Sequence, residues 1–432
     1  MPRPHNRQTT ALLLATSLAC PAAADTAINP AQTPAPFTEW DRATGDWGGL
    51  RTSLEDSGIT LDGEYTLEYS EVYDGGVNTQ DSFRNLLSLE IEANLETLFG
   101  LQGGTAFIQF LSASAENGGS QDAGDIQAFS NLEVDRSLDA IFELWYQQVL
   151  VDNRFRVKIG KFDVNTEFAA VGVLLEDSPI GAFTQSTAGF APSILGLPSY
   201  PDSATGVALF YTPLLTDDHN LTLAYGFFDG SSTVDGVPTG RRGPSTFFSD
   251  DRSDDYFHIA EAQFSWTSLG SLPEGSLSLG AWFHTGDFPE FDGGTTDGTA
   301  GLYLTAQQRL IAPNGPEEES GLYAFAQGGW SDPDVAEIEQ TYALGLVQVG
   351  TCPSRPHDQI GLYAALAVLS DEPAAGFDDD ELALEAFYRL QLTPALYIQP
   401  GLHYIINPSG NPTLAPPADN ALVGVCRVGI TF

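Results

Sequence analysis

The chain has 432 residues, 42% of them hydrophobic, and a mean hydropathy of -0.09, which excludes a disordered chain and also a bundle of membrane-spanning helices. Its 17 basic and 58 acidic residues give a formal net charge of -41, which argues against nucleic acid as a partner.

The N-terminus carries the features of an export signal. Arg3 and Arg7 precede the apolar run ALLLATSLACPAAA, which small residues close at position 24. This order is typical of a secretory signal peptide, so we expect residues 1–24 to be removed on export. Without Arg3 and Arg7 the chain keeps 15 of its 17 basic residues and all 58 acidic ones, a net charge of -43.

A short segment separates the signal peptide from the first predicted strand. Residues 30–36 are rich in proline and are interpreted as a linker. The stretch GGLRTSLEDSG has helical character, with Leu50 and Leu54 as its apolar residues and Gly58 placed to cap its C-terminus. We therefore assign residues 25–58 to an N-terminal periplasmic linker and a short helical segment.

Sixteen stretches, most of them about ten residues long, alternate between apolar and polar side chains, as strands that cross a membrane do. In ELALEAFYRLQL, for example, Leu382, Leu384 and Ala386 share one face, whereas Glu381 and Glu385 share the other. The predicted strands are 59–73, 83–97, 103–115, 139–151, 154–163, 204–212, 221–229, 256–267, 275–285, 300–310, 320–330, 340–349, 359–370, 379–391, 395–407 and 421–432.

The connections between these strands alternate in length. Those after even-numbered strands are short, such as LFGLQ and VDNR, whereas those after odd-numbered strands are often long, the longest running from 164 to 203. A water-soluble sandwich would rarely need sixteen strands in one unit. Lipid satisfies no backbone hydrogen bonds, so a membrane sheet must close on itself. The sequence predicts an all-β protein of the bacterial outer membrane, a 16-stranded antiparallel transmembrane β-barrel over residues 59–432.

The chain ends within its last predicted strand. In NALVGVCRVGITF, Cys426 and Val428 lie on one face and Val425 and Arg427 on the other, up to the terminal Phe432. The last strand must pair with the first to close the barrel. We therefore expect Phe432 at the periplasmic rim, where it resembles the assembly signal of outer-membrane proteins.

Six stretches spread over the mature chain carry a family resemblance. They are WDRATGDWGGLRTSLEDSGITLDGEYTLEY (40–69), ELWYQQ (143–148), VKIGKFDVNTEF (157–168), LGAWFHTGDF (279–288), GLYLTAQQRL (301–310) and YIQPGLHYIINPSG (397–410). Together they resemble the carbohydrate-selective porin family, the OprB-type sugar porins. The resemblance implies a sixteen-stranded barrel that passes glucose and similar sugars. The chain departs from the family pattern in its acidity and in having only two lysines, Lys158 and Lys161.

A channel for sugars needs a constriction with suitable side chains. Hydrogen bonds to carboxylates, amides and guanidinium groups hold neutral sugars, as does stacking on aromatic rings, and the binding must stay weak enough for release. A barrel of this size leaves an aqueous channel, so a segment must narrow it. The apolar connection 164–203 is predicted to fold into the lumen, with a lid over the outer mouth as the alternative.

Strand alternation then names the side chains on the lumenal face. Glu143 lies one tight turn from Arg156 and Lys158, which predicts an acid–base pair of walls at the narrowest level. The predicted pore-lining and substrate-binding residues are Glu143, Trp145, Gln147, Arg156, Lys158, Glu261, Gln263, His284, Gln307, Arg309, Glu385, Arg389, Gln399 and His403.

Other functions are less well supported by the sequence. A barrel enzyme would need a nucleophile with a base in reach, and no recognisable catalytic motif surrounds the five histidines of the mature chain. We therefore predict no enzyme and no cofactor. The alternative that the acidic composition supports is a general cation-selective porin without sugar specificity.

Metals, disulfides and partners complete the expectations. The acidic stretches 250–255 and 377–381 lack EF-hand spacing and are interpreted as solvated loops rather than metal sites. Export permits a disulfide between Cys352 and Cys426, and two free thiols are equally compatible with the sequence. The expected partners are mono- or oligosaccharides and outer-membrane lipid, and the sequence leaves open whether the chain forms a homo-oligomer.

Overall fold

The computed structural model describes residues 36–115, 119–134, 137–171, 179–230, 233–234, 237–238, 247, 255–313, 320–350, 354–414 and 416–432. The predicted signal peptide, nearly all of the linker 30–36, the acidic residues 250–254 and Cys352 lie outside these ranges. None of the helices in the described ranges has both the length and the apolar character that crossing a bilayer would require.

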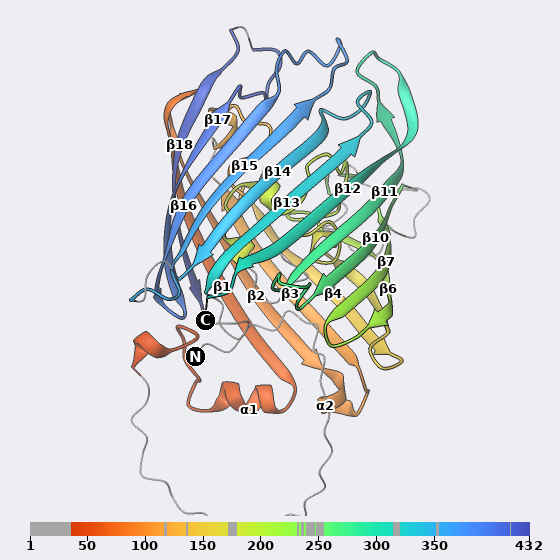
Figure 1. The fold of residues 1–432 in the computed structure, drawn as a ribbon, viewed down its shortest axis with the longest axis vertical. Coiled ribbons are helices and arrows are strands. Elements are labelled where there is room, and N and C mark those ends of the chain that lie inside the picture. Colours follow the sequence, from red (N-terminus) through yellow and green to blue (C-terminus); the bar gives the residue numbers. More distant parts are fainter. Residues whose placement is uncertain are drawn as a thin grey trace, which may run out of the picture.

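Sixteen antiparallel strands form one closed barrel (Figure 1). Each strand pairs with the barrel strands that precede and follow it in the chain, and the first and last strands, β1 and β18, pair with each other. Each predicted strand overlaps one of them, so the predicted fold class is confirmed. The barrel strands are β1 (Ile59–Gly76), β2 (Asp81–Asn94), β3 (Gly104–Ala115), β4 (Leu138–Leu150), β5 (Phe155–Phe162), β6 (Ala204–Leu215), β7 (His219–Asp229), β10 (Tyr256–Trp266), β11 (Gly275–Pro289), β12 (Thr295–Ile311), β13 (Gly321–Ser331), β14 (Ile338–Val349), β15 (Gln359–Leu369), β16 (Glu381–Thr393), β17 (Leu396–Ile406) and β18 (Asp419–Thr431).

Short helices and one separate hairpin lie between the barrel strands in the chain. The helix α1 (Leu50–Asp56) lies in the stretch expected to be helical, and Gly58 follows it with a positive φ of 94°. The predicted strand 83–97 is too long: the helix α2 (Leu95–Phe99) replaces its end, because the Asn94 side chain accepts a hydrogen bond from the Thr97 amide at 3.0 Å. The remaining elements are α3 (Ser120–Ala123), η1 (Phe37–Glu39), η2 (Val164–Thr166), η3 (Pro179–Ala182), η4 (Ser186–Ala188) and the two-stranded hairpin β8 (Thr233–Val234) and β9 (Val237–Pro238).

Strand alternation separates an apolar outer face from a lumenal face. In β11, for example, the Ser278 side chain is 2% exposed, whereas that of Leu279 is 59% exposed. The same exposure recurs around the ring at outward side chains such as Leu89, Ile91, Leu144, Ile159, Leu209, Leu223, Leu302, Leu344, Leu362 and Leu402. A continuous apolar outer surface is what a barrel surrounded by lipid requires.

The barrel closes at its C-terminal residue. The backbone N–H and C=O of Phe432 exchange hydrogen bonds of 2.8 and 2.9 Å with Gly63 of β1, and the Phe432 ring lies on Gly63 where a Cβ would clash. Ala43, in the segment before α1, donates its N–H to the Thr431 carbonyl at 2.8 Å. The chain's last residue is therefore part of the seam, as the alternating C-terminus predicted.

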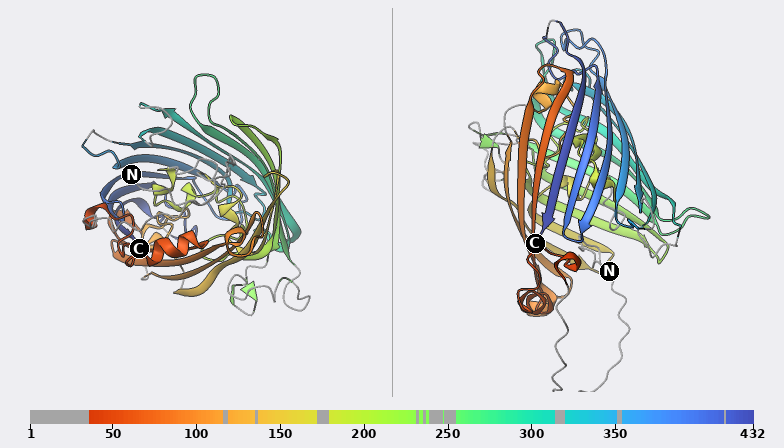
Figure 2. Two further views of the ribbon diagram at one scale, coloured as in Figure 1. Left: turned by 90° about the horizontal axis from the view of Figure 1, so that it is seen from below. Right: turned by 90° about the vertical axis from the view of Figure 1, so that its left-hand side faces the viewer.

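Two long connections fold into the barrel, where they are seen inside the ring of strands (Figure 2). We call the described part of the β3–β4 connection L2 (119–134), and the described parts of the β5–β6 connection L3 (163–171 and 179–203). L3 hydrogen-bonds to the inner wall at Glu261 and Glu385, which confirms that it enters the lumen. The inward folding of L2 is a feature that the sequence reading missed. The two segments also bond to each other, since the backbone N–H of Asn131 donates to the Thr184 carbonyl at 2.7 Å.

Apolar packing holds L3 against one side of the lumen. Phe168 is fully buried among wall residues such as Phe210 and Phe228, and Phe183 packs on Phe325 and other rings of β13, β15 and β16. Burying each of these phenylalanine rings of L3 stabilises the infolded conformation by about 1.5–3 kcal/mol. Apolar side chains of L3 and of the wall therefore pack together in the lumen next to β5–β7 and β10–β15.

Candidate functional site: a lumenal cavity

A cavity of about 420 Å³ lies between the inner wall and the two infolded segments. Its wall residues come from β1, β2, β16, β17 and β18, and L2 and L3 supply the opposite side. The lining residues are Glu64, Thr66, Leu86, Ser88, Asn131, Leu132, Gly181, Tyr200, Arg389, Tyr397 and Arg427. The cavity thus joins carboxylate, guanidinium, amide and aromatic groups, and its volume is in the range of small-molecule sites.

Arg389 is one of the two arginines that line the cavity. Its Nε donates to the Gln399 side chain at 2.7 Å, and its guanidinium lies 4.1 Å from the centre of the Tyr397 ring. Gln399 in turn donates to the Ala182 carbonyl of L3 at 2.7 Å, which ties the orientation of Arg389 to the infolded segment. Glu64 lines the same cavity, is exposed to it, and accepts a hydrogen bond from Thr66 at 3.2 Å.

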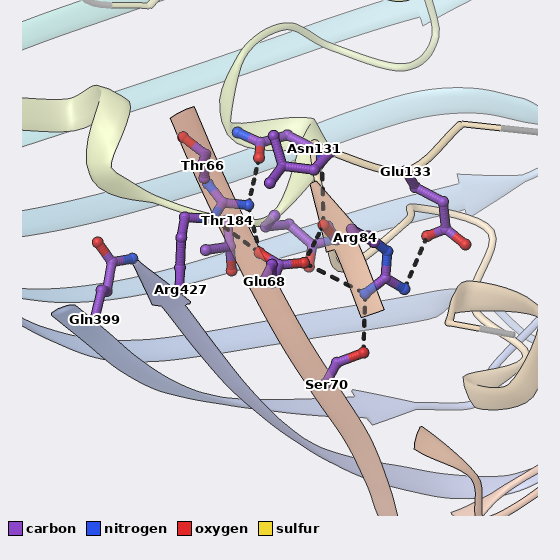
Figure 3. Close-up of polar contacts among 12 residues, drawn as sticks. Thr66, Glu68, Ser70, Arg84, Asn131, Glu133, Thr184, Gln399 and Arg427 are labelled. Carbon is purple, nitrogen blue, oxygen red and sulfur yellow. Dashed lines mark hydrogen bonds and ion pairs between the residues drawn. The ribbon is translucent and has the colours of Figure 1, made fainter. Parts of the chain in front are cut away.

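A row of charges crosses the seam of the barrel beside this cavity (Figure 3). Glu68 of β1 is directly opposite Arg427 of β18 and directly opposite Arg84 of β2 in the strand register. Arg427 donates to one Glu68 oxygen through Nε at 2.8 Å and Nη2 at 2.6 Å, and Arg84 donates to the other at 3.4 Å. Asn131 and Glu133 of L2 also contact this row, at Arg427 (2.7 Å) and Arg84 (3.9 Å).

Tyr200 of L3 completes the cavity on the side of the loops. Burial raises the pKa of its hydroxyl well above the ordinary range, so the hydroxyl stays protonated and can act as a donor. The ring packs edge-on to Phe142 with a centroid distance of 6.1 Å, and the backbone N–H donates to Asp163 at 3.2 Å. Tyr200 and Tyr397 are the aromatic residues of the lining.

A second ion cluster anchors L3 beside the wall of β4 and β5. The Glu167 carboxylate accepts hydrogen bonds from Arg156 at 2.7 Å and from Lys158 at 2.9 Å. Burial alone would raise the pKa of Glu167, but the charges of Arg156 and Lys158 outweigh burial and lower it to about 2. Lys158 is itself 3% exposed and lies 4.2 Å from the centre of the Trp145 ring.

The predicted acid–base pair of walls is not formed by the residues expected. Glu143 accepts from the Trp145 indole at 2.8 Å and from the Asp163 amide at 3.3 Å, and Arg156 and Lys158 pair with Glu167 instead. Their charges are compensated by a loop residue that strand alternation cannot identify. Glu64 and Arg389, an acid and a base that the prediction did not pair, both line the cavity.

Most of the other predicted site residues hold the infolded segments rather than line the cavity. Glu261, Glu385 and Gln399 bond to backbone groups of L3, as does Gln263. His403 contacts Thr184 at 2.9 Å. Arg156 also donates to Gln147 at 3.0 Å. The three remaining predicted residues bond to the barrel's own connections or strands, with His284 at the Gly230 carbonyl, Gln307 at Ser276, and Arg309 at Glu274 and the Ser320 carbonyl.

Arg389 is therefore the predicted site residue that appears in the lining of this cavity. Sequence reasoning missed Glu64, Asn131, Tyr200, Tyr397 and Arg427. Strand alternation carried a usable signal for Glu64, Tyr397 and Arg427, because each lies on the lumenal face of a predicted strand. Asn131 and Tyr200 lie in connections, where no periodic pattern marks them.

Within the described ranges, no group of three or more His, Cys, Asp or Glu side chains is placed to hold a metal ion. Cys426 is exposed on the outer face of β18 with a free thiol, and its proposed partner Cys352 lies outside the described residues.

A closed sixteen-stranded barrel with an apolar outer face and a lumen narrowed by infolded segments defines an outer-membrane porin. The chain belongs to the OprB family of carbohydrate-selective porins, which it matches over residues 82–432. It is thus a sugar porin of the bacterial outer membrane, as the resemblance implied, and its family and fold are those of a channel rather than an enzyme.

Individual relatives agree with this assignment. The chain is 25% identical to Porin B of Pseudomonas aeruginosa over 454 aligned positions, which cover 94% of each chain. It is 24% identical to the putative porin QuiX of Acinetobacter baylyi, over 85% of this chain and 88% of that one. The high-pH structure of Pseudomonas putida OprB has the same fold, with a TM-score of 0.76 and 21% identity over 92% of this chain and 100% of that chain.

Proposed function

We propose that sugars cross this porin through the lumenal cavity and are selected there by its charged, amide and aromatic lining. The observation that carries the proposal is the set of side chains around one 420 Å³ space: Glu64, Asn131, Arg389, Arg427, Tyr200 and Tyr397. Carboxylates accept hydrogen bonds from sugar hydroxyls, guanidinium groups donate to them, and the tyrosine rings offer apolar faces. Charges of both signs favour neutral polyols over ions of either sign.

The substrates proposed are monosaccharides or short oligosaccharides. Lipid of the outer membrane is the proposed partner of the apolar outer face, because outward leucines and isoleucines surround the ring. A general cation-selective porin would also permit ions to pass, but it would not require a carboxylate, two arginines, an amide and two tyrosines around one space.

Liposome swelling with sugars and with size-matched neutral solutes tests selectivity. We expect faster swelling with sugars, whereas equal rates would indicate a general pore. Sugar block of ion current in planar bilayers then tests the cavity itself. Arg389→Gln should weaken sugar block by about tenfold or more, because it removes a hydrogen bond to a charged group.

The control for this variant is Arg154→Gln. Arg154 lies on the β4–β5 turn and bonds to the Thr212 and Pro213 carbonyls, so the change removes the same charge outside the cavity. Equal sugar block in wild type, Arg389→Gln and Arg154→Gln would place the sugar contacts elsewhere in the lumen.

A further inference from the structure

Glu68 is a buried carboxylate that lies beside the cavity without lining it. Its side chain is 0% exposed, so a sugar in the cavity has no access to it. Its two oxygens nevertheless receive hydrogen bonds from three elements of the fold: Arg84 of β2, Arg427 of β18 and Ser130 of L2. Two of these partners are arginines on the two strands that flank β1, so one carboxylate forms ion pairs with both neighbouring strands.

The geometry of Arg427 shows what this contact does. Both Nε and Nη2 donate to the same Glu68 oxygen, and Nη2 also donates to the Asn131 side chain at 2.7 Å. This arrangement fixes the plane of the guanidinium and leaves Nη1 without a hydrogen-bond partner among the described residues. Because Arg427 lines the cavity, its remaining donor is presented to the lumen.

The same carboxylate positions Asn131 indirectly. Ser130 donates its hydroxyl to Glu68 at 2.5 Å, and the next residue, Asn131, accepts from Arg427. Two lining groups, one on β18 and one on L2, are thus held at a fixed separation by one residue of β1. The contact joins residues 359 positions apart, and it forms only when the first and last strands pair in the native register.

We propose that Glu68 is a positioning residue that sets both the orientation of Arg427 and the local charge of the sugar passage. The inference rests on the proposed function for its sugar readout, whereas its charge readout does not depend on sugar. In this row Arg84 and Arg427 face Glu68 and Glu133, two positive and two negative charges. Removing the Glu68 charge leaves an excess of one positive charge beside the cavity.

Two substitutions separate charge from position. Glu68→Gln removes the charge but keeps an oxygen that can accept from Arg427, so the reversal potential in a KCl gradient should shift toward anions. Glu68→Asp keeps the charge but is one methylene shorter and withdraws the carboxylate from Arg427. It should keep the wild-type reversal potential while sugar block weakens by about tenfold, the effect of losing one hydrogen bond to a charged group.

The matched control is Glu71→Gln, three residues further along the same strand. The Glu71 side chain accepts a hydrogen bond from Tyr69, whose ring is exposed on the outer face, so the change alters net charge equally without touching the row. A shift of the reversal potential as large as that of Glu68→Gln would mean that charge anywhere on the chain suffices, and the proposal would be wrong.

A second variant covers the case in which Glu68→Gln does not assemble. Glu68→Gln with Arg84→Gln restores the net charge of the row and keeps an acceptor for Arg427, so its reversal potential should equal that of wild type; a potential shifted toward anions would contradict the charge role. Assembled Glu68→Gln and Glu68→Asp channels that both keep the wild-type reversal potential and the wild-type sugar block would show a structural role only. If Arg389→Gln leaves sugar block intact but Glu68→Gln still shifts the reversal potential, the proposed sugar site fails and the charge role of Glu68 stands.

Discussion

Removing the Glu167 carboxylate should release L3 from the wall. Glu167 is the shared partner of Arg156 and Lys158, at 2.7 and 2.9 Å, and its side chain is 11% exposed. The pKa of Glu167 is lowered from 4.5 to about 2, which means that its surroundings stabilise the ionised carboxylate over the protonated one by about 3 kcal/mol. The range for breaking a buried ion pair, about 3–5 kcal/mol, agrees with this value.

A loss of about 3 kcal/mol changes the ratio of docked to undocked L3 by roughly 100-fold. Single-channel recordings of Glu167→Gln should therefore show a larger and noisier conductance than wild type. The control is Glu337→Gln, which removes the same charge from an exposed position between β13 and β14. Conductance and noise equal to those of wild type in Glu167→Gln channels would refute the view that this ion cluster holds L3.

The docking of L3 should also depend on pH through Glu167. Because the pKa of Glu167 is lowered in the folded state, its contribution to the docking of L3 is complete above pH 4.5 or so. This contribution disappears as the pH falls toward about 2. Wild-type conductance should then become noisy in that acid range. Glu167→Gln channels should be noisy throughout and should show no such transition.

Three further predictions concern other parts of the barrel. Deleting Phe432 removes the backbone pairing and ring contact at Gly63, so the yield of heat-resistant barrel in the outer membrane should fall; normal insertion would contradict this reading of the C-terminus. Burial, and then the charge of a neighbouring glutamate, raise the pKa of Asp163 to about 7, so its stabilising contribution is complete below about 3.8 and lost as the pH rises through 7; thermal stability of Asp163→Asn should lack this dependence. The acidic excess of the chain should make KCl reversal potentials favour cations at low salt, where screening is weak, with a Debye length of about 10 Å at 0.1 M; anion preference would instead assign control to arginines in the lumen.

The fold was predictable because its signals are local. Alternation along each strand is visible within ten to twenty residues, and the connections between the strands alternate between short and long. Together these two patterns require a closed antiparallel sheet. The error at 95–97 has the same local character: apolar alternation continues into α2. Capping by Asn94 begins the helix where the strand ends, and the left-handed Gly100 ends the helix.

The site was harder to predict because it depends on contacts that are distant in sequence. Alternation shows that Glu261 and Arg389 both face inward, but it does not show which of them the infolded segments cover. L3 covers the Glu261 side of the lumen, where the Ala169 amide donates to Glu261 at 2.7 Å, and it leaves Arg389 at the open side. The packing of L3 therefore decides which lumenal residues meet the solute.

The distribution of charge explains how a chain of net charge -41 can pass neutral sugars selectively. In the described site, arginines face carboxylates: Arg389 and Glu64 both line the cavity, and Glu68 lies between Arg84 and Arg427. An arginine offers several donors in one plane, so it can bond to a carboxylate on one side and still present a donor to the lumen. The acidic excess lies outside these pairs and acts on ions at long range, where salt screens it. In the proposed function, selection of a neutral sugar depends instead on short hydrogen bonds, which salt does not screen. Raising the salt concentration should therefore reduce ion preference while leaving sugar preference in place.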